Sequence, residues 1–282
     1  MAVSEYQYYE FLAIDRPLDD VEQAAIRSLS TRATITATSF MNDYHWGDFK
    51  GDPNWLMERY YDAHLYVADW GTRRVMFRLP SDLLDPAVVE DYCVGDQMSA
   101  WTTDEYIVLD AISEDHPNDV DYDAETMLTA IVGVRAELAA GDLRPLYIAW
   151  LAAYGTWERD EDAFTRDADN DLEPPVPPGL GDLTTAQRAL ADFLRLDRTL
   201  LAVAAQASPP PHDPRDLAAH LATLPTSKKD QLLTQLLQGE AAQARNSLQH
   251  LLHHQAAPTS PTPTRRTVGT LLDTAAHHRI SH

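Results

Sequence analysis

Cysteine is almost missing from this 282-residue sequence, since Cys93 is the only one. A single cysteine excludes an internal disulfide and any zinc or iron–sulfur site built from several cysteines. The surrounding D-Y-C-V-G segment holds no basic side chain that would favour the thiolate. We therefore expect Cys93 to be an inert thiol.

Long apolar runs are missing as well. No stretch approaches the roughly 18 apolar residues that a membrane-spanning helix needs. The N-terminal segment MAVSEYQYYEFLAID has neither the basic region nor the apolar region of a signal peptide. The sequence therefore predicts a cytoplasmic protein that does not engage a membrane.

Basic residues are scarce relative to acidic ones. The chain holds 22 Lys and Arg against 44 Asp and Glu, for a formal net charge of −22. Residues 201–282 are close to neutral, so almost all of the negative charge lies in residues 1–200. A field of this sign repels phosphates. It argues against direct nucleic-acid binding and favours a protein partner that is itself basic.

The familiar catalytic motifs are absent too. The sequence has no G-x-S-x-G, no G-x-x-x-x-G-K-[ST], no G-x-G-x-x-G and no H-E-x-x-H. His250, His253 and His254 share one face of a predicted helix, but no acidic or cysteine ligand accompanies them. We therefore predict no catalytic residue, no metal site and no cofactor.

What the sequence does hold is an α+β pattern in residues 1–157. Period-two alternation and helical periodicity follow one another there. The predicted strands are 6–14, 33–40, 64–69, 73–79 and 100–112, the last as one strand or a hairpin, and the predicted helices are 18–29, 53–63, 83–92, 124–140 and 143–154. We expect a mixed β-sheet of five or six strands with helices on one face.

The rest of the chain reads as three further segments. Residues 158–182 form an acidic, proline-rich loop or linker, 183–255 an all-helical region, and 256–282 a flexible tether with a short terminal helix. The pattern leaves open whether the helical region packs on the first domain, and it leaves the oligomeric state open.

The loop before the predicted helix 53–63 is the candidate binding surface. It mixes aromatic, acidic and basic side chains, as ligand-binding loops do. The candidate residues are Tyr44, His45, Trp46, Asp48, Lys50 and Trp55. The alternative is that the aromatic side chains, Trp46 and Phe49 among them, simply pack onto the sheet.

Two apolar stripes near the C-terminus form a candidate partner-binding helix surface. Their residues are Leu248, Leu251, Leu252, Val268, Leu271 and Leu272. A helix as short as 268–276 is marginal alone, so it either docks on the body or waits for a partner.

Three stretches, YYEFLAIDRPL at 8–18, HWGDFKG at 45–51 and AAGDLR at 139–144, resemble a family of uncharacterised soluble bacterial proteins from GC-rich genomes. The resemblance covers roughly residues 5–205. It implies a non-secreted protein and carries no activity or site residue with it.

These patterns lead to three hypotheses about function. The favoured one is a non-enzymatic interaction or accessory protein that acts through its acidic body and its C-terminal amphipathic helices. The second is a hydrolase or nucleic-acid-processing enzyme of unfamiliar motif, built on the 42–50 loop with His45, Asp48 and Lys50, with His64 as a further member. The third is an inhibitor whose acidic face mimics nucleic acid.

Overall fold

A computed structural model describes residues 6–114, 124–155, 170–210, 221–238, 244, 248 and 265–280. Seven strands form one sheet in the order β2-β3-β1-β4-β5-β7-β6, and every neighbouring pair is antiparallel. The strands are β1 (Gln7–Leu12), β2 (Thr34–Ile35), β3 (Ser39–Tyr44), β4 (Ala63–Ala68), β5 (Arg73–Pro80), β6 (Met98–Thr102) and β7 (Tyr106–Ser113).

The α+β class is confirmed, but the prediction of a mixed sheet with five or six strands is wrong. A tight turn divides the predicted strand 33–40 in two, and residues 100–112 form the hairpin rather than the single strand, so the sheet has seven strands. Residues 33–40 contain the β2–β3 turn, where Thr36 Oγ1 lies 2.7 Å from Ser39 Oγ, and residues 100–112 contain the β6–β7 turn. Turns this short join antiparallel neighbours, because a parallel pair needs a crossover of a dozen or more residues.

Several of the helices begin directly after a residue whose side chain caps the first turn. Asp19 closes a capping box with Glu22, Asp52 precedes the proline that opens the second helix, and Thr184 closes a capping box with Gln187. The helices are α1 (Asp20–Arg27), α2 (Pro53–Arg59), α3 (Pro86–Glu90), α4 (Ala124–Ile131), α5 (Gly133–Ala139), α6 (Arg144–Gly155), α7 (Thr185–Phe193), α8 (Arg198–Ala205), α10 (Thr226–Leu237) and α12 (Val268–Ile280). The predicted single helix 124–140 is divided at Val132 into α4 and α5.

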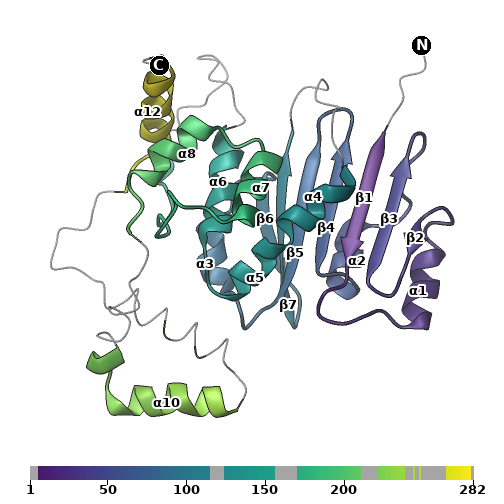
Figure 1. The fold of residues 1–282 in the computed structure, drawn as a ribbon, viewed down its shortest axis with the longest axis horizontal. Coiled ribbons are helices and arrows are strands. Elements are labelled where there is room, and N and C mark those ends of the chain that lie inside the picture. Colours follow the sequence, from purple (N-terminus) through teal and green to yellow (C-terminus); the bar gives the residue numbers. More distant parts are fainter. Residues whose placement is uncertain are drawn as a thin grey trace.

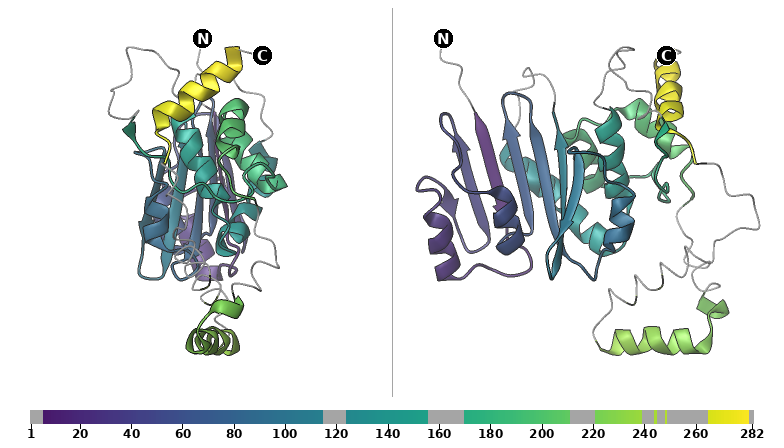
Figure 2. Two further views of the ribbon diagram at one scale, coloured as in Figure 1. Left: turned by 90° about the vertical axis from the view of Figure 1, so that its left-hand side faces the viewer. Right: turned by 180° about the vertical axis from the view of Figure 1, so that it is seen from behind.

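Helices cover both faces of the sheet, so the expectation of one covered face is also wrong. Ile26 of α1 and Leu56 and Met57 of α2 pack with Phe11 and Met76 in one core cluster. Helices α3 to α8 and α12 pack against the opposite face in a larger cluster. The view from behind in Figure 2 shows α2 on the side of the sheet away from α4 to α8. The strands carry apolar side chains on both sides, and this is what admits two layers.

One core joins the sheet to the C-terminal helices. Leu190 of α7, Leu200 of α8 and Leu271 of α12 belong to the same buried cluster as Val75 and Leu109 of the sheet. The described parts of the region after residue 182 are helical, and α7 and α8 pack on the first part of the chain. Helix α10 lies apart from this body (Figure 1) and has its own small cluster around Leu224 and Leu232.

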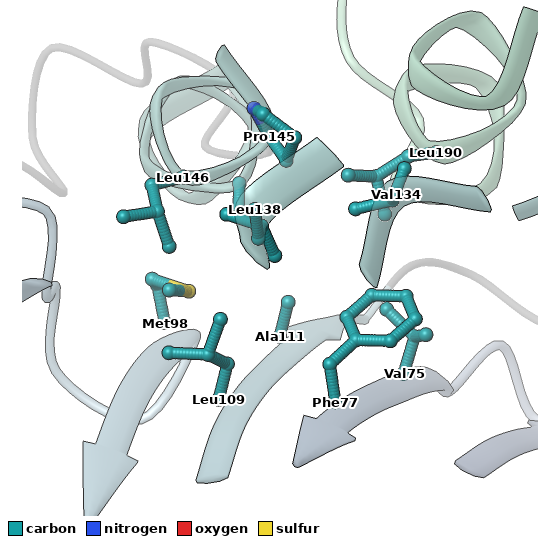
Figure 3. Close-up of a pocket in the computed structure, with 11 residues that line it drawn as sticks. Val75, Phe77, Met98, Leu109, Ala111, Val134, Leu138, Pro145, Leu146 and Leu190 are labelled. Atoms are coloured by element: carbon teal, nitrogen blue, oxygen red, sulfur yellow. The ribbon is translucent and has the colours of Figure 1, made fainter. Parts of the chain in front are cut away.

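A small gap of about 20 Å³ lies inside the large core, between the sheet and the helices above it (Figure 3). Val75, Phe77 and Leu109 line it from the strands, and Leu138 and Leu146 line it from the helices. All of its labelled side chains are apolar, so it is a packing gap and offers a ligand no polar group. Across the described residues, no helix has both the length and the apolar character needed to cross a membrane.

Candidate binding site on the open part of the sheet

One half of the α4 face of the sheet lacks a helical cover. Helix α4 lies against β1 and β4, and no ribbon of the described chain crosses in front of β3 (Figure 1). The strand register places Asp43 of β3 opposite Tyr8 of β1, and Met41 opposite both Glu10 of β1 and Thr34 of β2. Directly opposed residues point to the same face. On this face Thr34 and Asp43 are exposed and Met41 is half-buried, while Tyr8 and Glu10 beside them are buried.

A polar pocket of about 310 Å³ lies on this face. Its volume lies at the lower end of the range for small-molecule sites, roughly 300–1,000 Å³. The lining residues come from three strands, from the segment before β2 and from the first turn of α4, and they are Tyr6, Tyr8, Arg32, Thr34, Met41, Asn42, Asp43 and Glu125. Tyr6, Tyr8, Arg32, Asp43 and Glu125 give it an ionisable lining, and we call it the sheet pocket.

Glu10 lies beside the sheet pocket as a buried carboxylate with few partners. Its residue is 6% exposed, and the hydroxyl of Tyr8 donates to Glu10 Oε2 at 3.2 Å. No other hydrogen bond and no ion pair reaches this carboxylate from the described part of the chain. Burial raises the pKa of Glu10 to about 7, against the lowering effect of the Tyr8 hydrogen bond, and the nearby Glu125 carboxylate raises it further.

Two more carboxylates act on the same region. Burial, then Asp43, then Glu125 raise the pKa of Tyr6, and burial, then Glu10, then Glu125 raise the pKa of Tyr8. These electrostatic effects fall off with distance. Asp43, Glu10 and Glu125 therefore sit close enough to the two tyrosines to build one negative potential in the sheet pocket. Glu125 itself has no ion pair or hydrogen bond to the described chain.

Aromatic rings and one guanidinium form the rim. The rings of Tyr6 and His45 lie 5.4 Å apart, and His45 Nε2 lies 3.1 Å from Asp43 Oδ2. The guanidinium of Arg32 sits over the ring of Trp46 at 5.6 Å. Trp46 is 68% exposed, which is unusual for a side chain of this size. The rim thus presents both a cation and aromatic faces next to the carboxylates.

The predicted binding loop is divided among different places. His45 and Trp46 lie at the rim of the sheet pocket, while Tyr44 is buried on the opposite face and packs against Phe49. The packing alternative therefore describes Phe49, and Trp46 remains exposed.

The other loop residues lie elsewhere. Asp48 accepts a hydrogen bond from Gln7 Nε2 at 3.0 Å, Lys50 is exposed, and Trp55 packs under Arg59 at 5.1 Å. His64 is fully buried in the sheet, with its pKa lowered to about 3 by burial. The structure does not bring His45, Asp48, Lys50 and His64 together in one pocket.

The predicted partner helix is also divided. Val268, Leu271 and Leu272 are buried at 1%, 1% and 6% exposure in the large core, so the terminal helix docks on the body. Leu248 packs beside the separate α10 cluster, and Leu251 and Leu252 lie outside the described residues. Part of the apolar surface that was expected to bind a partner is therefore buried within the chain itself.

Sequence reasoning missed Tyr6, Tyr8, Glu10, Arg32 and Glu125. One signal was available, because Glu10 is a charged residue inside the otherwise apolar and aromatic strand YQYYEFL. The remaining residues come from distant segments that only the fold unites. In the part of the chain that the structure describes, no group of three or more His, Cys, Asp or Glu is arranged to hold a metal ion.

Comparison with known proteins leaves the site to be interpreted from its own chemistry. No family model matches this chain, and neither a curated protein nor a solved structure matches it.

Proposed function

We propose that this chain is a non-enzymatic binding protein that recognises a basic protein partner by taking a lysine-like ammonium group into the sheet pocket. The observation that carries the proposal is that Asp43 and Glu125 line one pocket and Glu10 lies beside it, while the only ion-pair partner of the three within the described residues is His45 on Asp43. Carboxylates that are not held in ion pairs attract a cation from outside.

The aromatic residues support the same ligand class. A cation placed over the face of Tyr or Trp gains roughly 0.5–2 kcal/mol, depending on how well it is desolvated. Tyr6 and Tyr8 line the pocket, and Trp46 already holds one cation, Arg32, in this way. An ammonium ion entering the pocket would thus meet carboxylates and ring faces together.

The charge of the whole chain supports a protein as the source of that ammonium. A formal net charge of −22 raises the rate at which a basic partner meets the chain and makes the encounter depend on salt. The small volume of the sheet pocket suits one side chain of such a partner, and the exposed Trp46 beside it would extend the contact.

The proposal is tested by titrating the full chain, by NMR or calorimetry, with a peptide that carries one central lysine and with the same peptide carrying norleucine. The lysine peptide should bind and the norleucine peptide should not. Glu125→Gln should weaken binding by about tenfold, which corresponds to ~1.4 kcal/mol.

Glu105→Gln is the matched control, because Glu105 is an equally exposed glutamate in the β6–β7 turn and does not line the pocket. It should leave the affinity unchanged. Equal binding of the lysine and norleucine peptides, or equal weakening by both variants, would reject the sheet pocket as the recognition site.

A further inference from the structure

Arg32 lines the sheet pocket and stacks on the Trp46 ring, but its charge is not paired with a carboxylate of the described chain. It is exposed, and it makes no hydrogen bond or ion pair with any described residue. Its guanidinium carbon lies over the ring of Trp46, 5.6 Å from the ring centroid. A guanidinium that stacks on an aromatic face keeps its N–H groups in a plane where they remain free to donate.

Two half-buried arginines, Arg74 and Arg144, are used differently. Arg74 donates twice to Asp110, at 2.8 and 2.7 Å, and Arg144 donates to Asp142 at 2.6 Å. Each of these pairs neutralises a neighbouring carboxylate. Arg32 shares its pocket with Asp43 and Glu125 without pairing with either, so positive and negative charge remain separate within one pocket.

A pocket with this arrangement has two poles. Asp43 is turned to His45, and Glu125 enters from α4, on the β1 side of the pocket, whereas Arg32 enters from the segment before β2, at the sheet edge. A ligand with a single positive charge would leave Arg32 unpaired and repelled. A ligand with an ammonium at one end and a carboxylate at the other would satisfy both poles.

We propose that the group recognised in the sheet pocket is zwitterionic, with its ammonium on the carboxylate pole and its carboxylate bound by Arg32. This rests on the proposed function for the ammonium half. A free basic amino acid and the carboxyl-terminal lysine of a protein partner both carry this chemistry, and capture of a terminal carboxylate is an established mode of peptide recognition.

The test compares ligands that differ only in the carboxylate. L-Lysine, lysine amide, and the peptide Gly-Gly-Lys with a free or an amidated carboxyl terminus are titrated into the full chain, by NMR. The free carboxylate forms should bind about tenfold tighter than the amides. If Gly-Gly-Lys with a free carboxyl terminus binds more tightly than free lysine, the natural ligand is the carboxyl terminus of a protein. If free lysine binds more tightly, the natural ligand is the free amino acid.

Arg32→Gln should abolish the preference by weakening the carboxylate forms, while the amides bind as before or better because a like charge is gone. Arg59→Gln is the matched control, since Arg59 stacks on Trp55 at 5.1 Å in the same manner but does not line the pocket. It should leave the preference intact.

The two proposals fail in different ways. Equal binding of lysine and lysine amide by the unchanged protein, or a preference that survives Arg32→Gln, overturns the zwitterion and leaves the ammonium site standing. Absence of binding by every one of these ligands overturns both proposals.

Discussion

Asp62 and Glu10 are both buried carboxylates, 1% and 6% exposed, but they differ in how many hydrogen-bond donors surround them. Asp62 accepts from Arg78 Nε and Nη2 at 3.1 and 2.7 Å, and from the backbone N–H groups of Ile14 and Asp15 at 2.6 and 2.9 Å. Glu10 accepts from Tyr8 alone among the described residues. Glu10 lies in β1 and Asp62 directly precedes β4, the strand that pairs with β1, and the two carboxylates differ in their partners.

This contrast separates structural carboxylates from the candidate binding ones. A buried charge is tolerated when it is paired and fully hydrogen-bonded, and otherwise it costs free energy or stays protonated. Asp62 joins the end of β1 to β5, and Arg135 extends the network from α5 by donating to the carbonyl oxygen of Arg78 at 2.7 Å. Glu10 joins no elements together. Its incomplete set of partners fits a group that an external cation completes.

The largest effect is expected at the structural carboxylate. Asp62→Ala removes all four acceptor contacts and leaves the guanidinium of Arg78 buried at 4% exposure without its anion. Breaking a buried ion pair from one side costs about 3–5 kcal/mol of unfolding free energy. Urea denaturation should show this loss against the unchanged protein, and a loss below about 1 kcal/mol would remove Asp62 from the structural class.

Glu173 is a second structural carboxylate, and breaking its ion pair should cost less stability and act more locally. Arg266 donates to it at 2.7 and 2.6 Å, Tyr147 donates to it, and this cluster ties the start of α12 to the body. Arg266→Ala should cost about 2 kcal/mol. Hydrogen exchange should show lost protection concentrated in α12. The control is Arg279→Ala, because Arg279 is half-exposed and lies 3.8 Å from Asp197. Equal exchange in both variants would contradict the prediction.

At Glu10 we expect a stability that depends on pH, rather than a loss of stability that is the same at every pH. Its pKa is raised to about 7 in the folded chain, from 4.5. Between these values the unfolded chain has released the proton and the folded chain retains it, so stability falls as pH rises from about 4.5 through 7. Glu10→Gln keeps the neutral form at every pH. The melting temperature of the variant, relative to that of the unchanged protein, should rise as the pH increases from 5 to 8. A difference in melting temperature that stays constant over this range would show that Glu10 does not titrate in it.

Much of the fold follows from local sequence signals. The helices expected at 18–29, 53–63 and 83–92 are present as α1, α2 and α3, and the alternation at 73–79 gives β5. Local patterns do not contain the strand order, because β1 pairs with β3 on one side and β4 on the other, and both strands lie further along the chain. The second helical layer was missed for a related reason: α1 and α2 bury one face each, and the sequence does not say against which side of the sheet.

The candidate site was less predictable than the fold. His45 and Trp46 were selected because aromatic and polar residues in a loop suggest binding, and both lie at the rim of the sheet pocket. The carboxylates that line the pocket come from β3 and α4, Glu10 of β1 lies beside them, and no short-range spacing links the three. A lone charge in an aromatic strand, Glu10, is the residue from which sequence reasoning would have to start.

The smallest effect on stability is expected at Asp43, and it gives the sharpest form of the comparison with Asp62. The side chains of Asp43 and His45 are each 56% exposed, and an exposed pair of this kind contributes roughly 0–1 kcal/mol. Asp43→Asn should therefore leave the unfolding free energy within about 0.5 kcal/mol of the unchanged protein. The same substitution should weaken the binding of a lysine peptide by about threefold, because one of the carboxylates that attract the ammonium is neutralised. If Asp43→Asn destabilised the chain as Asp62→Ala does, the open part of the sheet would be a structural surface and the distinction between the two kinds of carboxylate would fail.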